Sequence, residues 1–126
     1  EGTLTRDANY WPMVAKTGLA RLAVMTKAPV IPVAQWGAQA VLPAYSKKFR
    51  IFPRKKLQVK AGAPLDFSKW YGMEGDSAAM VEATEYAMAA ITSILEELRG
   101  EKRPTDIFDP HNSALPRTGN YKKKSK

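Results

Sequence analysis

Hydrophobic positions recur at three- and four-residue steps over residues 77–99, which predicts a long amphipathic helix. Its apolar face consists of Met80, Ala83, Ala87, Ile91, Ile94 and Leu98. Asp76 or Ser77 can cap the start, and Gly100 stands where a left-handed residue ends a helix. We therefore expect this helix to lie on a sheet, with its acidic positions as a solvated face rather than as paired catalytic acids. Those positions are Glu82, Glu85, Glu96 and Glu97.

A shorter helix and two strands are predicted earlier in the chain. Residues 17–26 place Leu19, Leu22, Ala23 and Thr26 at helical spacing, with Thr17 as the N-cap and Pro29 preventing continuation. Residues 28–37, APVIPVAQWG, form a continuous apolar run that predicts a strand buried on both faces. A half-exposed strand is expected over residues 57–60, where apolar and polar residues alternate. A helix followed closely by a buried strand is half of a βαβ unit, so we expect an α/β fold.

Pro32 is unusual inside the predicted buried strand. Proline removes a hydrogen-bond donor and is normally confined to edge strands, strand starts or bulges. Either the strand lies at an edge, or the proline serves a functional site.

The two ends of the chain have little periodicity. Residues 1–16 are rich in loop formers, and residues 101–126 contain three prolines, few apolar residues and a lysine cluster. We expect one domain portion over residues 1–100 and a basic tail, extended or disordered, over residues 101–126.

Charge points to an anionic partner. The chain has 20 lysines and arginines against 12 acidic residues, a net charge of +8. Residues 47–60 contain seven basic residues and no acidic one, interleaved with Phe49, Ile51 and Phe52. This segment either touches an anionic membrane and attracts anionic substrates or is an inert basic surface, and its apolar residues either contact lipid or fill the core.

Composition also excludes several classes of site. Without cysteine the chain has no disulfide, thiolate metal site or cysteine nucleophile. No apolar run reaches the roughly 18 to 20 residues of a spanning helix, so any membrane contact is expected at the surface. We expect neither a metal nor a cofactor.

The opening residues, EGTLTRD, suit an anion. Gly2 permits close backbone approach, Thr3 and Thr5 carry hydroxyls, and Arg6 has a planar fork that matches phosphate. A simple turn is the alternative interpretation of so short a pattern.

EGTLTRD, then WPMVAKTGLARLA, then APVIPVAQWGAQ resemble, in order and spacing, the later motif blocks of PlsC-type 1-acylglycerol-3-phosphate acyltransferases, most closely the actinobacterial ones. The resemblance is strong over residues 1–37 and implies part of a glycerolipid-acyltransferase-like sheet flanked by helices. It assigns acceptor glycerol-phosphate binding to Glu1, Gly2 and Thr3. Arg6 takes the phosphate contact although Leu4 stands where the family commonly has arginine, and Lys16 lies near the same anion. The apolar block that lines the family's site maps onto Val30, Ile31, Pro32 and Val33, which would explain the proline.

The resemblance also implies a reaction. The family transfers an acyl group from acyl-CoA or acyl carrier protein to lysophosphatidate, giving phosphatidate at the cytoplasmic face of the membrane. A histidine of a His-x4-Asp motif is the general base in that family, and the motif precedes the EGT block. The single histidine here, His111, has no aspartate at the matching position. We therefore expect Glu1 to be internal to a longer enzyme, and this chain to be inactive alone, with no catalytic residue of its own.

A small basic nucleic-acid-binding module is the alternative function. Trp11, Tyr45, Phe49 and Phe52 would then stack on bases, and the lysine-rich tail would act as an electrostatic arm. This alternative explains the charge but leaves the three motif blocks unexplained, so we expect no nucleic-acid partner.

Overall fold

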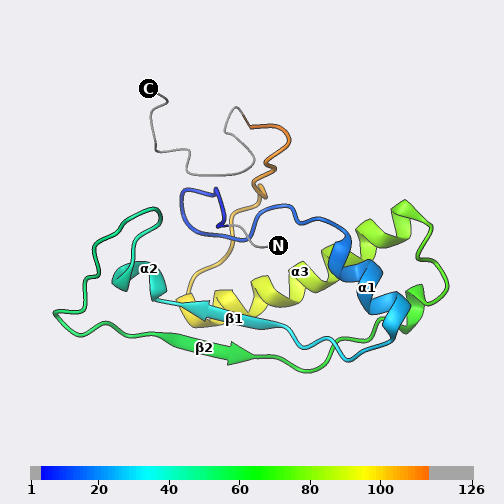
Figure 1. Ribbon diagram of the computed structural model, residues 1–126, viewed down its shortest axis with the longest axis horizontal. Coiled ribbons are helices and arrows are strands. Elements are labelled where there is room, and N and C mark those ends of the chain that lie inside the picture. Colours follow the sequence, from blue (N-terminus) through cyan, green and yellow to red (C-terminus); the bar gives the residue numbers. More distant parts are fainter. Residues whose placement is uncertain (1–3, 114–126) are drawn as a thin grey trace.

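This computed structural model describes residues 4–113 of the chain. They form helices and a small antiparallel sheet of two strands. In chain order they are α1 (Gly18–Thr26), β1 (Val33–Trp36), α2 (Ala38–Val41), β2 (Gln58–Ala61), a 3-10 turn η1 (Ser68–Trp70) and α3 (Ser77–Arg99). The helix α3 runs along the long axis, with the two strands beside it and α1 against its first half (Figure 1). The fold is thus broadly α/β.

The expectation of a doubly buried strand in a βαβ unit is wrong. β1 pairs with β2 in antiparallel register, with Val33 opposite Ala61 and Trp36 opposite Gln58. Ala34 is buried against α3, whereas Val33 on the opposite face is half exposed. Within residues 4–113 no element covers that second face of the sheet. An apolar run has the composition of a doubly buried strand, but it does not establish that a second layer exists.

Pro32 is accommodated at the start of β1. It directly precedes the strand, and its carbonyl accepts a hydrogen bond of 2.9 Å from the Gly62 N–H. A strand start is a position where the missing donor of proline costs little, so the backbone alone accounts for the residue. Gly62 lies opposite it in close packing, since a Cβ there would lie 3.0 Å from the Pro32 ring and 2.9 Å from the Ile94 Cδ1, and the Ile94 side chain would have to shift.

The long helix and both of its ends match the sequence pattern. The Asp76 carboxylate accepts hydrogen bonds from the backbone N–H groups of Ala78 and Ala79, at 2.8 and 3.3 Å. Gly100 ends α3 in the left-handed conformation with φ of 66°, and its N–H donates to the Glu96 carbonyl. On the predicted face, Met80, Ala83, Ala87 and Ile94 are buried, and Ile91 and Leu98 are partly buried.

Removing the cap has a measurable cost. Asp76→Ala is expected to lower the free energy of unfolding by about 1 kcal/mol, because two N–H groups of the first turn lose their acceptor. Urea denaturation measures the loss, and Glu74→Ala, which removes an exposed acid from the preceding turn, is the matched control. Equal stability of the two variants would contradict the capping role.

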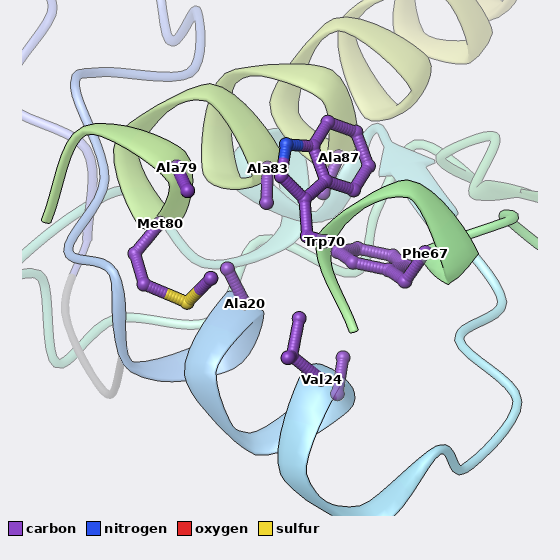
Figure 2. Packing of buried hydrophobic residues seen from close by; sticks show 9 residues of the cluster. Ala20, Val24, Phe67, Trp70, Ala79, Met80, Ala83 and Ala87 are labelled. Carbon is purple, nitrogen blue, oxygen red and sulfur yellow. The ribbon is translucent and has the colours of Figure 1, made fainter. Parts of the chain in front are cut away.

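Small side chains bring α1 close to α3. The first core cluster joins α1, the segment around η1 and α3, and Met80 of α3 is fully buried beside α1 (Figure 2). Its members are Ala20, Ala23, Val24, Phe67, Trp70, Ala79, Met80, Ala83 and Ala87. The helix at α1 was predicted correctly, but its buried face only in part: Ala23 is buried as predicted, whereas Leu19 and Leu22 are exposed. Alanine allows two helices to approach more closely than leucine does. The alanine face of α1, with Ala20 and Ala23, therefore packs against α3.

A second cluster joins the opening loop to the sheet and α3. It contains Trp11, Ala34, Ile94 and Leu95, with Trp36, Ile91 and Leu98 packed against it. Trp11 therefore anchors the opening loop, residues 4–16.

Candidate functional site

The opening loop, residues 4–16, is shaped by its own polar side chains. The Asp7 carboxylate accepts from the N–H groups of Asn9 and Trp11, at 2.9 and 3.0 Å. The Thr5 hydroxyl donates to the Trp11 carbonyl at 2.6 Å and accepts from the Asp7 N–H at 3.2 Å. Because a hydroxyl has one proton, Thr5 has none left to donate to a ligand. Thr5 and Asp7 therefore serve the shape of the loop.

Arg99, at the end of α3, clamps this loop. Its guanidinium carbon lies 3.9 Å from the centroid of the Trp11 ring and 4.2 Å from that of Trp36. Nη1 donates to the Asn9 carbonyl at 2.8 Å, and Nη2 pairs with the Glu101 carboxylate at 2.7 Å. The side chain is almost fully buried. Sequence analysis missed this residue, although an arginine in the last turn of the predicted helix and the tryptophans Trp11 and Trp36 could have indicated a cation–ring contact.

A hollow of about 420 Å³ lies between the opening loop, one flank of α3 and the segment after the helix. The Val14 N–H donates to the Phe108 carbonyl at 3.0 Å, which joins the loop to that segment. Apolar residues form most of its wall, and the principal ones are Trp11, Pro12, Met13, Val14, Val81, Met88, Ala89, Pro104, Ile107 and Phe108. Its volume lies in the range of small-molecule sites.

Two hydroxyls of α3 that line the hollow donate within the helix. Thr84 and Thr92 donate to the carbonyls of Met80 and Met88 on the preceding turn of α3, both at 2.7 Å. An apolar ligand would therefore leave no hydroxyl donor of these two residues unsatisfied.

Charged residues of both signs also line the hollow. They are Asp7, Glu85, Asp106 and Arg103. The Arg103 backbone N–H donates to the Glu96 carboxylate at 2.9 Å, and this bond lowers the pKa of that carboxyl below its usual value. Glu96 thus fastens the start of the segment that closes the hollow. Three acids against one base disfavour a phosphate inside it, so its chemistry suits an alkyl chain.

The structure does not bring all expected site residues together. Arg6 is buried, with 4% of its surface exposed, whereas Lys16 is exposed. Glu1, Gly2 and Thr3 lie outside the described residues. The expected lining block is split: Pro32 is buried and Val30 half buried, while Ile31 and Val33 are exposed. The lining of the hollow includes neither Arg6, Lys16 nor residues 30–33.

No catalytic constellation is assembled within residues 4–113. His111 is exposed, and its backbone N–H donates to the Asp109 carboxylate. In the same range no cluster of His, Cys, Asp and Glu could hold a metal ion.

Comparisons with protein families, with curated proteins and with solved structures find no match to this chain. Among the described residues, no helix combines the length and the apolar character needed to cross a membrane.

Proposed function

We propose that this chain is part of a lysophosphatidate acyltransferase that receives its acyl group from acyl-CoA or acyl carrier protein. The observation that carries the proposal is the apolar hollow, because its wall includes residues of the opening loop, which contains parts of two of the three resembling blocks. Both the acceptor and the product of this reaction carry a long alkyl chain. A site for them needs an apolar wall and a separate cationic group for phosphate.

The two parts of the ligand are assigned to different residues. The alkyl chain takes the hollow, where each buried methylene contributes about 0.8 kcal/mol. The glycerol phosphate is assigned to Glu1, Gly2, Thr3 and Arg6, with Lys16 adding long-range attraction. The acids beside the hollow support this division, since they would repel a phosphate placed there. We assign no catalytic residue to this chain.

Ligand-dependent stability tests the proposal. Lysophosphatidate at 100 times its dissociation constant is expected to stabilise the chain by about 2.7 kcal/mol, seen as a raised thermal midpoint. Duplex DNA at equal phosphate concentration is the comparison ligand, and it is expected to leave the midpoint unchanged. A shift with DNA alone, or equal shifts with both, would count for the nucleic-acid alternative. Trp11 already weighs against that alternative, because its ring is buried beneath Arg99.

A further inference from the structure

The connection between α2 and β2 presents apolar side chains to solvent. We call residues 47–57 the cationic loop. Its four large apolar residues are Phe49, Ile51, Phe52 and Leu57, which are 69%, 65%, 83% and 59% exposed. They do not fill the core, which was one of the two alternatives from sequence. In Figure 1 this connection lies at one end of the long axis, on the far side of α2 from the core. Large apolar side chains that are exposed within one short segment indicate an interaction site.

The charge around these side chains has one sign. The cationic loop contains Lys47, Lys48, Arg50, Arg54, Lys55 and Lys56, and no acidic residue occurs between Asp7 and Asp66. Within residues 4–113 none of these six cations belongs to an ion pair.

The acids at the end of α3 are engaged by other cations. Glu97 pairs with Lys60 of β2, Glu96 with Lys102, and Glu101 with Arg99. The positive charge of the cationic loop is therefore not neutralised by ion pairs within residues 4–113, and it is available to an anionic partner.

We propose that the cationic loop docks on an anionic lipid surface, with its four apolar side chains in the headgroup region and its cations on lipid phosphates. Basic residues near such a surface and apolar residues inserted into it add to binding. Nucleic acid fits less well, because Ile51 and Leu57 have no aromatic ring to stack on a base. This inference is independent of the proposed acyl transfer, since it rests on a different surface.

The contribution of the loop's cations to lipid binding is tested by removing their charge. The 126-residue chain is sedimented with vesicles of equimolar phosphatidylcholine and phosphatidylglycerol, and with vesicles of phosphatidylcholine alone. Binding is expected on the anionic vesicles and is expected to weaken as salt rises. The triple variant Lys47→Gln, Lys48→Gln, Arg50→Gln should bind about 100-fold more weakly. The matched control, Lys122→Gln, Lys123→Gln, Lys124→Gln, removes the same charge from the tail, and an equal loss there would overturn docking by the loop.

The contribution of the loop's apolar side chains is tested by measuring how deeply they insert into the lipid. The indole introduced by Phe52→Trp should be quenched by brominated lipid in the anionic vesicles, after subtraction of the signal of the unsubstituted chain. The double variant Phe49→Ser, Phe52→Ser should bind about tenfold more weakly while its circular dichroism stays unchanged. Absence of quenching in bound protein, or displacement of the vesicles by duplex DNA at equal phosphate concentration, would overturn the proposal.

Discussion

Arg99→Ala is expected to lower the free energy of unfolding by about 3 kcal/mol and to release the opening loop from α3. The variant loses two ring contacts of a buried cation, worth about 1 kcal/mol or more each, and a charged hydrogen bond to the Asn9 carbonyl of similar value. Because Trp11 lies against the hollow as well as against Arg99, the variant should also lose the alkyl-chain site. Chemical denaturation gives the stability, and hydrogen exchange at residues 8–14 reports release of the loop.

Two further variants show whether the clamp depends on a planar guanidinium. Arg99→Lys keeps the charge but not the fork that stacks between two indoles, so its stability should lie between those of the parent and the alanine variant. Arg103→Ala removes an exposed arginine nearby and should leave exchange in the loop unchanged apart from local effects. If Arg99→Lys were as stable as the parent, stacking between Trp11 and Trp36 would not be the source of the clamp.

Met80→Ala is expected to cost about 2 to 5 kcal/mol of unfolding free energy, a large part of the stability of so small a domain. Met80 is 0% exposed and lies between α3 and α1, near Ala79 and Ala20, in a cluster whose alanines cannot expand into the space (Figure 2). The loss is measured by urea denaturation.

The control for the Met80→Ala prediction is a variant that nearly conserves the side-chain volume. Met80→Leu is that variant, and it should lower the free energy of unfolding by less than about 1.5 kcal/mol. Met88→Ala removes the same atoms from a half-buried position at the hollow and should cost less than Met80→Ala. Equal losses at the two positions would mean that the first core cluster is not the stabilising centre of the fold.

Local features were predictable from the sequence, and α3 is the clearest case. Its period, its Asp76 cap and its Gly100 end are all set by residues within a few positions of each other. The strand at β2 and the loop character of residues 4–16 followed from equally local patterns.

Features that depend on distant partners were not predictable. Leu57 and Val59 of the β2 region are apolar yet exposed, because Gln58 and Lys60 occupy the face toward α3: Gln58 bonds to the Leu98 carbonyl and Lys60 pairs with Glu97. No pattern within a strand says which face another element will cover.

The candidate site shows the same limit. Arg99, Trp11 and Trp36 come from three separate segments, and the hollow also needs residues 103–108, which sequence analysis placed in an extended or disordered tail. The sequence identified the loop as a candidate site, whereas the clamp and the apolar wall depend on tertiary packing. Glu1, Gly2 and Thr3 remain predictions that concern residues outside the described range.

Titration calorimetry with lysophosphatidate, below its micelle concentration, tests the central claim that the hollow receives the alkyl chain of this lipid. Ala89→Phe places a ring in the hollow from an exposed position on α3, and Ser93→Phe places the same ring at an exposed position outside it. We expect saturable binding of one lipid to the parent and to Ser93→Phe, and binding at least about tenfold weaker to Ala89→Phe. No saturable binding to the parent, or equal binding to both variants, would contradict the claim and leave docking of the cationic loop on anionic vesicles to be judged by its own experiments.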